Sequence, residues 1–127
     1  MKILLFLAKG VETMELSVFV DVFGWARFEC NTDTQIITCG FNKQVISAFN
    51  IPITVDTMIE NVNVDDYDAI AIPGGFEEFG FYEEAYDSQF LSLIQEFETK
   101  NKIIATICVG ALPVAKSGVL KNRKATT

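Results

Sequence analysis

Histidine is absent from this chain of 127 residues. Without an imidazole, the chain alone supplies neither a Ser/His/Asp triad, nor a Cys/His dyad, nor a histidine-ligated zinc site. It also has no side chain whose unperturbed pKa lies near neutrality. Any catalysis by this chain alone therefore proceeds without an imidazole group.

Positive charge is also scarce, with 10 lysine and arginine residues against 17 aspartates and glutamates and a net charge of −7. Nucleic acids and anionic membrane surfaces favour lysine and arginine, so the composition predicts neither as a partner. No apolar run is long enough to cross a bilayer. The apolar N-terminal run stops at Lys9, too early for a secretory signal, and indicates a strand.

Cysteine is limited to Cys30, Cys39 and Cys108, an odd and unclustered set. The set fits neither a disulfide framework nor a metal-binding knot, so we expect a reducing cytoplasm, at least one free thiol and no metal. Neither G-x-G-x-x-G nor G-K-S/T occurs, which argues against nucleotide phosphate binding, and no cofactor is expected. A length of 127 residues is typical of a single domain.

Strand and helix patterns alternate along the chain. Strands are predicted at residues 2–7, 34–39, 69–72 and 102–107, with short strands or a hairpin at 44–49 and 53–55. Helices are predicted at 14–28, 86–99 and 109–116, with Gly118 as a left-handed cap. This alternation predicts an α/β fold, with a mostly parallel sheet and helices on both faces. Sites in such sheets form at the carboxyl ends of the strands.

Apolar residues recur at helical spacing in the first predicted helix. The stripe runs through Met14, Val18, Val22 and Trp25, with Phe19, Phe23 and Ala26 beside it. Glu12, Thr13 and Glu15 supply the start of this helix, which places carboxylates at its positive end.

Cys108 stands where a buried strand runs into a helix with small residues, within Ile107-Cys108-Val109-Gly110-Ala111. A sharp strand-to-helix turn of this kind, a nucleophile elbow, exposes the side chain at its apex. The following helix directs amides and the positive end of its dipole at the sulfur, which predicts a lowered thiol pKa. The alternative is that Cys108 is a small buried hydrophobic residue at a strand end.

Pro73-Gly74-Gly75 follows the predicted strand 69–72 directly. Consecutive glycines let the backbone turn its amides toward a neighbouring strand end, which predicts an oxyanion site beside Cys108. The alternative is an ordinary tight turn.

Glu15 lies near the start of the first predicted helix, close behind the first strand. A carboxyl group beside a thiolate is driven to protonate, and a protonated Glu15 would donate a hydrogen bond to the sulfur. The alternative is a solvated glutamate that complements the helix dipole. Spacing alone does not bring Glu15 to Cys108.

Two further features carry weaker predictions. Cys30 and Cys39 end a helix and a strand, so structural burial is predicted for both, with redox sensitivity as the alternative. The run from Phe76 to Tyr86 alternates aromatic and acidic residues. It fits a lid, an oligomer contact or a solvated loop anchored by its rings.

Together these segments resemble the ThiJ/PfpI superfamily. The resemblance rests on Ala8-Lys9-Gly10-Val11-Glu12-Thr13-Met14-Glu15, on Pro73-Gly74-Gly75, on the Cys108 elbow and on the segment 118–127, in order along the whole chain. It implies a flavodoxin-like α/β sandwich, as in class I glutamine amidotransferases, and a homodimer. It also implies that Cys108 is the reactive nucleophile, that Glu15 is its protonated partner, and that Gly74 and Gly75, with Cys108 or Val109, supply the oxyanion amides.

The chain departs from the superfamily pattern in two places. The protease branch carries a histidine directly after the cysteine, where this chain has Val109, so proteolysis is disfavoured. Many other members place a histidine just beyond the strand that Lys124 begins here, and their domains continue through further strands and helices. We therefore expect residues 1–127 to form one domain that lacks its C-terminal portion, with the absent histidine in the missing segment.

The resemblance leaves the reaction open, since similar proteins include glyoxalases, deglycases, isocyanide hydratases, chaperones and sensors of cysteine oxidation. The first hypothesis is an enzyme in which the Cys108 thiolate adds to a small reactive carbonyl or related electrophile. The alternative is a stress sensor or chaperone-like protein that acts through oxidation of Cys108. A third possibility is a fragment that completes its fold only with the missing segment.

Overall fold

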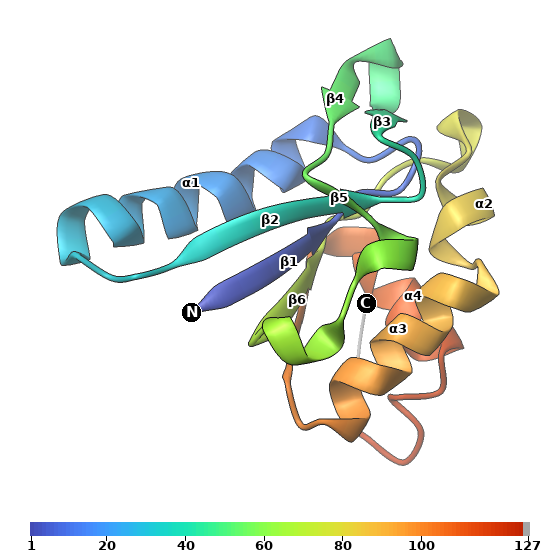
Figure 1. Cartoon of the computed structure of the whole chain (residues 1–127). Coiled ribbons are helices and arrows are strands. Elements are labelled where there is room, and N and C mark those ends of the chain that lie inside the picture. Colours follow the sequence, from blue (N-terminus) through green and yellow to red (C-terminus); the bar gives the residue numbers. More distant parts are fainter. Residues whose placement is uncertain (126–127) are drawn as a thin grey trace.

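A five-stranded sheet forms the centre of the molecule in the computed structural model, which describes residues 1–125 (Figure 1). The strand order is β5-β2-β1-β6-β7, and every pairing in this sheet is parallel. The strands are β1 (Lys2–Phe6), β2 (Gln35–Gly40), β5 (Thr57–Met58), β6 (Ala69–Ile72) and β7 (Ile103–Thr106). The strands β1, β2, β6 and β7 were predicted from the sequence, because each contains a run of apolar residues.

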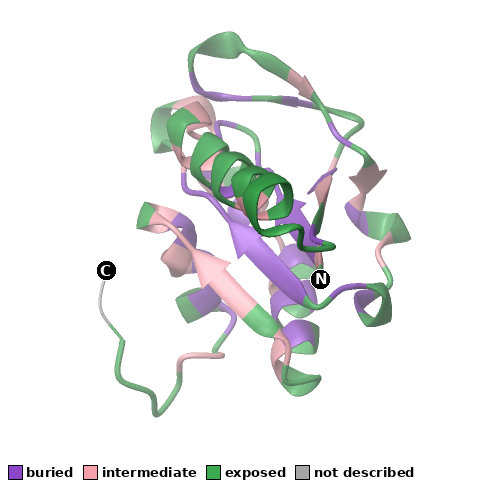
Figure 2. Cartoon of the chain, turned by 90° about the vertical axis from the view of Figure 1, so that its left-hand side faces the viewer, coloured by how far each residue is buried: buried purple, intermediate pink, exposed green. Residues whose placement is uncertain are grey.

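Helices cover both faces of the sheet, which confirms the predicted α/β architecture. The helix α1 (Thr13–Cys30) packs on one face, and α2 (Phe81–Ala85), α3 (Ser88–Thr99) and α4 (Ala111–Lys116) lie on the other (Figure 1). Alternate side chains of β1 enter the two cores, with Leu4 and Phe6 on the three-helix side and Ile3 and Leu5 on the α1 side. A two-sided core of this kind explains why β1 and β6 are buried along nearly their whole length (Figure 2).

Smaller elements occupy the connections. The predicted hairpin is present as antiparallel strands β3 (Gln44–Ile46) and β4 (Pro52–Thr54). Short 3₁₀ turns are found at Ala48–Asn50, Ile59–Asn61, Val64–Asp66, Glu77–Phe79 and Cys108–Gly110. Gly118 has a φ of 86°, so the predicted left-handed backbone is confirmed there.

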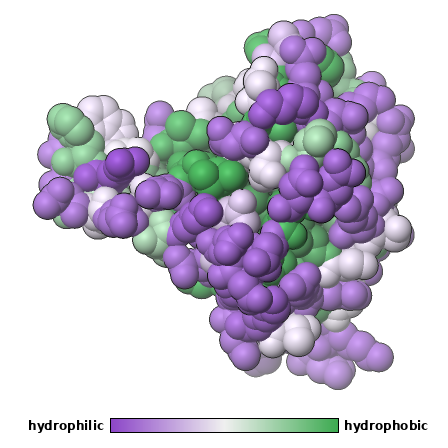
Figure 3. All heavy atoms as spheres, viewed as in Figure 1, coloured by the Kyte–Doolittle hydropathy of each residue, from purple (hydrophilic) through white to green (hydrophobic). Residues whose placement is uncertain are grey.

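The broad apolar stripe predicted for α1 divides between the sheet and the surface. Phe19 is only 8% exposed, and Leu16 and Phe23 pack beside it on the sheet. The other members lie outward, with Met14, Val18, Val22 and Trp25 76%, 48%, 58% and 60% exposed. Both sides of α1 are apolar, so the periodicity does not choose between them. Green apolar residues consequently reach the surface over α1 in Figure 3.

Some element boundaries also differ from the prediction. The predicted helix 86–99 begins only at Ser88, and α2 precedes it as a separate helix that starts after Gly80, whose φ is 83°. Cys108 to Gly110 form a 3₁₀ turn, so α4 is shorter than the predicted helix 109–116. Lys124 and Ala125 lie outside any strand, and the rest of the strand predicted there lies outside the described residues.

The part of the chain that the structure describes contains no helix both long and apolar enough to cross a membrane.

Candidate active site

Three loops meet at the carboxyl edge of the sheet. They follow β1, β6 and β7, which are neighbours in the sheet, and Ile72 and Thr106 stand side by side just before two of them. The site residues predicted from sequence lie on these loops and on the first turn of α1, which follows the β1 loop. The fold therefore brings Glu15, Gly74, Cys108 and Val109 together, as the topology of parallel sheets favours.

Glu15 is fixed by the start of α1. The backbone N–H of Glu12 donates to the carbonyl of Gly74 at 2.9 Å, which ties the end of the β1 loop to the glycine pair. The side chain of Glu12 accepts from the N–H of Met14 and caps the helix. One turn into α1, the Oε2 atom of Glu15 accepts a hydrogen bond from the N–H of Gly74 at 2.7 Å. The carboxyl group of Glu15 is thus turned inward to the site.

Close approach of neighbouring atoms explains both glycines of the pair. A Cβ atom on Gly74 would lie 2.8 Å from Oε2 of Glu15 and 3.1 Å from the backbone nitrogen of Val109. A Cβ atom on Gly75 would lie 2.4 Å from the carbonyl oxygen of Gly10 and 2.4 Å from the ring of Phe81. The backbone contact makes glycine necessary at Gly75, and a side chain at Gly74 would displace the carboxyl group of Glu15.

The structure changes which backbone amides are candidates for the predicted oxyanion site. The amide of Gly74 is already committed to the carboxyl group of Glu15. The amide of Val109 is directed to the sulfur of Cys108. Of the glycine pair, Gly75 is therefore the better candidate for binding a negatively charged oxygen, and Gly74 is a residue that positions Glu15.

Cys108 occupies the apex of the turn after β7. Its φ of 53° is in the left-handed region, which a residue with a side chain rarely adopts. Two residues later, a Cβ atom on Gly110 would lie 2.3 Å from the carbonyl oxygen of Ile72, so the chain passes very close to β6. The side chain of Cys108 is exposed. This geometry confirms a sharp strand-to-helix elbow and excludes the alternative of a buried structural cysteine.

Backbone strain at Cys108 leads to a stability prediction. Cys108→Gly is expected to be more stable than Cys108→Ala by about 1 kcal/mol, because glycine adopts a positive φ without steric cost. Urea unfolding of both variants measures the difference, and the exposed position removes little packing in either case. A Cys108→Gly variant less stable than Cys108→Ala would contradict strain at the apex.

The pKa of the Cys108 thiol is raised above its ordinary value, not lowered as predicted. Loss of solvent around the sulfur is the largest cause, a hydrogen bond from the Val109 amide acts in the opposite sense, and Glu15 raises the pKa further through a hydrogen bond and its charge. The prediction was wrong because loss of solvent around the sulfur and the carboxyl group of Glu15 together outweigh the hydrogen bond from the Val109 amide. A thiol that donates to Glu15 fits this arrangement.

The other two cysteines lie away from the site. Cys39 is fully buried in β2, and burial raises the pKa of its thiol to about 12. Cys30 ends α1 and is exposed, so the prediction of burial is wrong for this residue. Its position on the last turn of a long helix carries it beyond the sheet. Chemical reagents therefore meet two accessible thiols, at Cys30 and Cys108, and one protected thiol at Cys39.

The aromatic and acidic run that follows the glycine pair is ordered around a buried ring. Phe81 is 1% exposed and lies against Gly75. The N–H of Lys9 donates to Glu84 at 2.7 Å, and the Nζ atom of Lys9 pairs with Glu83 at 2.8 Å. These contacts join α2 to the β1 loop beside the site. The predictions for this run were a lid or an oligomer contact over the site, or a solvated loop anchored by its rings.

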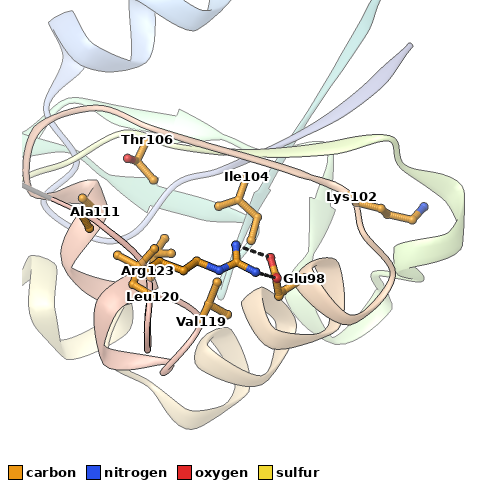
Figure 4. Close-up of a pocket in the computed structure, with 10 residues that line it drawn as sticks. Glu98, Lys102, Ile104, Thr106, Ala111, Val119, Leu120 and Arg123 are labelled. Carbon is orange, nitrogen blue, oxygen red and sulfur yellow. Dashed lines mark hydrogen bonds and ion pairs between the residues drawn. The ribbon is translucent and has the colours of Figure 1, made fainter.

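A separate hollow of about 340 Å³ lies along β7, on the face that carries α3 and α4. Ile104, Val119 and Leu120 line it, and Arg123 reaches across to Glu98 in an ion pair (Figure 4). Cys108 and Glu15 do not line this hollow. It is therefore distinct from the candidate active site.

Comparisons with known proteins show which sequences this chain is similar to. The profile of the DJ-1/PfpI family matches residues 1–127. An uncharacterized protein of Methanocaldococcus jannaschii, MJ0967, is 41% identical over 102 residues, which are 80% of this chain and 48% of that protein. Deglycase PfpI of Pyrococcus furiosus is 31% identical over 130 residues, covering 100% of this chain and 72% of that protein.

Solved structures show the same fold. Drosophila melanogaster DJ-1beta superposes with a TM-score of 0.77 at 28% identity, covering 92% of this chain and 60% of that chain. Oxidized Toxoplasma gondii DJ-1 superposes with a TM-score of 0.82 at 23% identity, covering 99% of this chain and 66% of that chain. This chain thus spans about half of the Methanocaldococcus protein and 60% of the Drosophila chain.

Proposed function

This chain belongs to the DJ-1/PfpI family, and from that membership we propose that Cys108 is a nucleophile acting on small reactive carbonyl compounds or related electrophiles. The observation that carries the proposal is the exposed thiol at the elbow apex, in contact with the carboxyl group of Glu15 and the amide of Val109. The Pyrococcus furiosus relative is named a deglycase, which supports glyoxalase or deglycase chemistry ahead of the hydratase type.

The proposed first step forms a bond between sulfur and the carbonyl carbon. Glu15 accepts the thiol proton, the sulfur attacks, and the π electrons of the carbonyl move to its oxygen. The amides of Gly75 and Val109 stabilise the resulting negative charge. Val109 stands where the protease branch has histidine, so peptide hydrolysis is not proposed.

Selective labelling tests the assignment, because only two thiols are accessible. In Cys30→Ser, iodoacetamide is expected to label Cys108 alone, while the buried Cys39 stays unmodified. Loss of methylglyoxal turnover should follow the fraction of Cys108 labelled, as read by peptide mass spectrometry. Full labelling with turnover retained, or no turnover before labelling, would overturn the proposed enzyme.

The sensor function from the sequence analysis is the second candidate. An exposed cysteine beside a backbone amide favours it, since an amide N–H stabilises an oxidised, negatively charged sulfur. Mild peroxide would then add two oxygen atoms to Cys108 before it alters the equally exposed Cys30. Equal oxidation of both residues would count against a sensor.

Three unpaired cysteines also support the proposed cytoplasmic location.

We also propose that further polypeptide extends the sheet beyond β7. Within residues 1–125, β7 is the last strand on its side, and its Ile103 is 59% exposed. The N–H groups of Ile103 and Ile107 bond to β6, which leaves those of Ile104 and Thr106 directed to the open side. Apolar open edges are normally covered. The longer relatives support a C-terminal portion that covers this one.

A homodimer is the proposed assembly. The outward side of α1 presents Met14, Val18, Val22, Trp25 and Phe28, each at least 48% exposed. A two-fold axis would bring the same residues of two copies together and remove them from water. The molar mass of the protein in solution tests this proposal.

A further inference from the structure

We propose that Phe81 is a positioning residue of the candidate active site, because its ring holds Gly75 with the Gly75 amide directed to the Cys108 elbow. The inference rests on the proposed function and deepens it, since this amide is proposed to stabilise the negatively charged oxygen. It also gives a role to the helix α2, which begins at Phe81.

The backbone around Gly75 is paired with the β1 loop on one side. Val11 and Gly75 form an isolated antiparallel bridge. The carbonyl of the residue before Gly75 accepts from the N–H of Glu12 at 2.9 Å, and the N–H of the residue after it donates to the carbonyl of Gly10 at 3.2 Å. Because both bonds are made by the flanking residues, the N–H of Gly75 itself points away from the β1 loop.

The other side of Gly75 is the side of Cys108. In the sheet, β6 lies between β1 and β7, so the loop after β6 has the β1 loop on one side and the elbow on the other. A Cβ atom on Gly74 would lie 3.1 Å from the backbone nitrogen of Val109. The N–H of Gly74 is bound to Glu15, whereas that of Gly75 has no hydrogen-bond partner among the described residues. The Gly75 amide can therefore bind a substrate oxygen at the elbow.

The Phe81 ring and the Gly10 carbonyl close the space around the Cα atom of Gly75. A Cβ atom on Gly75 would lie 2.4 Å from Cδ2 and 2.9 Å from Cγ of the ring, and 2.4 Å from the carbonyl oxygen of Gly10. The ring is only 1% exposed. Since a rotation of the backbone at Gly75 would press it against these atoms, the two contacts fix the direction of its amide.

A tight turn brings the Phe81 ring back to Gly75. The N–H groups of Phe79 and Phe81 both donate to the carbonyl of Phe76, at 3.1 and 3.2 Å. Gly80 has a φ of 83°, a left-handed conformation that glycine adopts without steric cost. The side chain at the start of α2 is thereby returned to the backbone that follows β6.

Contacts between α2 and the β1 loop hold this arrangement together. The N–H of Lys9 donates to Glu84 at 2.7 Å, and its Nζ atom pairs with Glu83 at 2.8 Å. Lys9 directly precedes Gly10, whose carbonyl oxygen is the second contact at Gly75. The helix that carries the ring is thus bound to the loop that carries the carbonyl.

The chemistry of the site restricts the effect of the ring to carbonyl addition. Negative charge develops on the substrate oxygen only as the C–S bond forms, so a correctly held amide lowers the barrier without tighter substrate binding. Alkylation of Cys108 by iodoacetamide displaces iodide and develops no charge on an oxygen atom. Loss of the ring should therefore slow the first reaction and leave the second unchanged.

Phe81→Leu tests the proposal, with Phe97→Leu as the matched control. Phe97 is fully buried in the same core, and its carbonyl accepts from Lys102 just before β7 begins, at the sheet edge opposite the elbow. We expect Phe81→Leu to lower kcat for methylglyoxal about 30-fold with little change in KM. Phe97→Leu should leave kcat within about threefold of the parent. The alkylation rate of Cys108, followed by peptide mass spectrometry, should be equal in all three proteins.

Thermal unfolding checks the fold of both variants, because each loses part of a buried ring. Phe81→Met fills a similar volume with a flexible side chain and takes the place of Phe81→Leu if that variant does not fold. The same expectations apply to it.

The outcomes separate the two proposals. Turnover retained in a folded Phe81 variant overturns the role of the ring and leaves Cys108 as the nucleophile. Equal losses in Phe81→Leu and Phe97→Leu, or a parallel fall in the alkylation rate, show that the ring acts through core stability and also overturn it. Absence of turnover in the parent protein overturns the proposed function itself, and the role of Phe81 with it.

Discussion

Serine in place of Cys108 is expected to abolish turnover of reactive aldehydes while the fold stays intact. A hydroxyl group is far harder to deprotonate than a thiol, and the site offers only the carboxyl group of Glu15 as a base. Loss of a nucleophile of this kind lowers kcat by roughly three orders of magnitude or more. Methylglyoxal consumption measures the loss, and thermal unfolding checks the fold.

Cys30→Ser is the matched control for this substitution. Both cysteines are exposed, so the two replacements remove the same atoms from similar surroundings. Cys30 ends α1, away from the glycine pair, and its replacement should leave turnover within about twofold of the parent. Comparable activity in Cys108→Ser and Cys30→Ser would contradict a nucleophile at the elbow.

The sheet could be predicted from sequence because its signal is local. Ala69 to Ile72 is a run of four apolar residues with aspartates before it and Pro73-Gly74-Gly75 after it, and it forms β6 with the predicted bounds. A strand buried on both faces needs such a run wherever its neighbours lie. The outward side of α1 could not be predicted in this way. Leu16 and Phe19 face the sheet while Val18 and Val22 do not, although all four are apolar.

The residues that lie together at the candidate site were named from the sequence, but the direction of the Cys108 pKa shift was not predicted correctly. Cys108 and the glycine pair follow strands, so their meeting at one sheet edge follows from the topology. Glu15 was named as a candidate from its place at the start of the first helix, but nothing local indicates its contact with the Gly74 amide. The direction of the thiol pKa shift was wrong because it depends first on loss of solvent around the sulfur and then on the neighbouring Glu15, neither of which is visible in the sequence.

Glu15→Gln is expected to speed the alkylation of Cys108 and to slow turnover. The charge of Glu15 disfavours the thiolate, so its removal lowers the thiol pKa and increases the thiolate fraction between pH 7 and 8. Alkylation of Cys108 should then be faster at these pH values, and its pH midpoint should fall. Turnover should decrease about 100-fold, because glutamine cannot accept the proton that the thiol loses. A simple loss of structure would lower both rates.

The fold of this variant should be preserved, since the amide oxygen of glutamine can still accept from the Gly74 N–H that Glu15 binds at 2.7 Å. Glu12→Gln is the control, because it removes an equal charge from the same end of α1 where the side chain only caps the helix. It should leave both the alkylation midpoint and turnover nearly unchanged. If Glu15→Gln unfolds at the same temperature as the parent and still slows alkylation and turnover together, Glu15 stabilises the thiolate as a protonated donor. The carboxylate would then not be the base that activates Cys108.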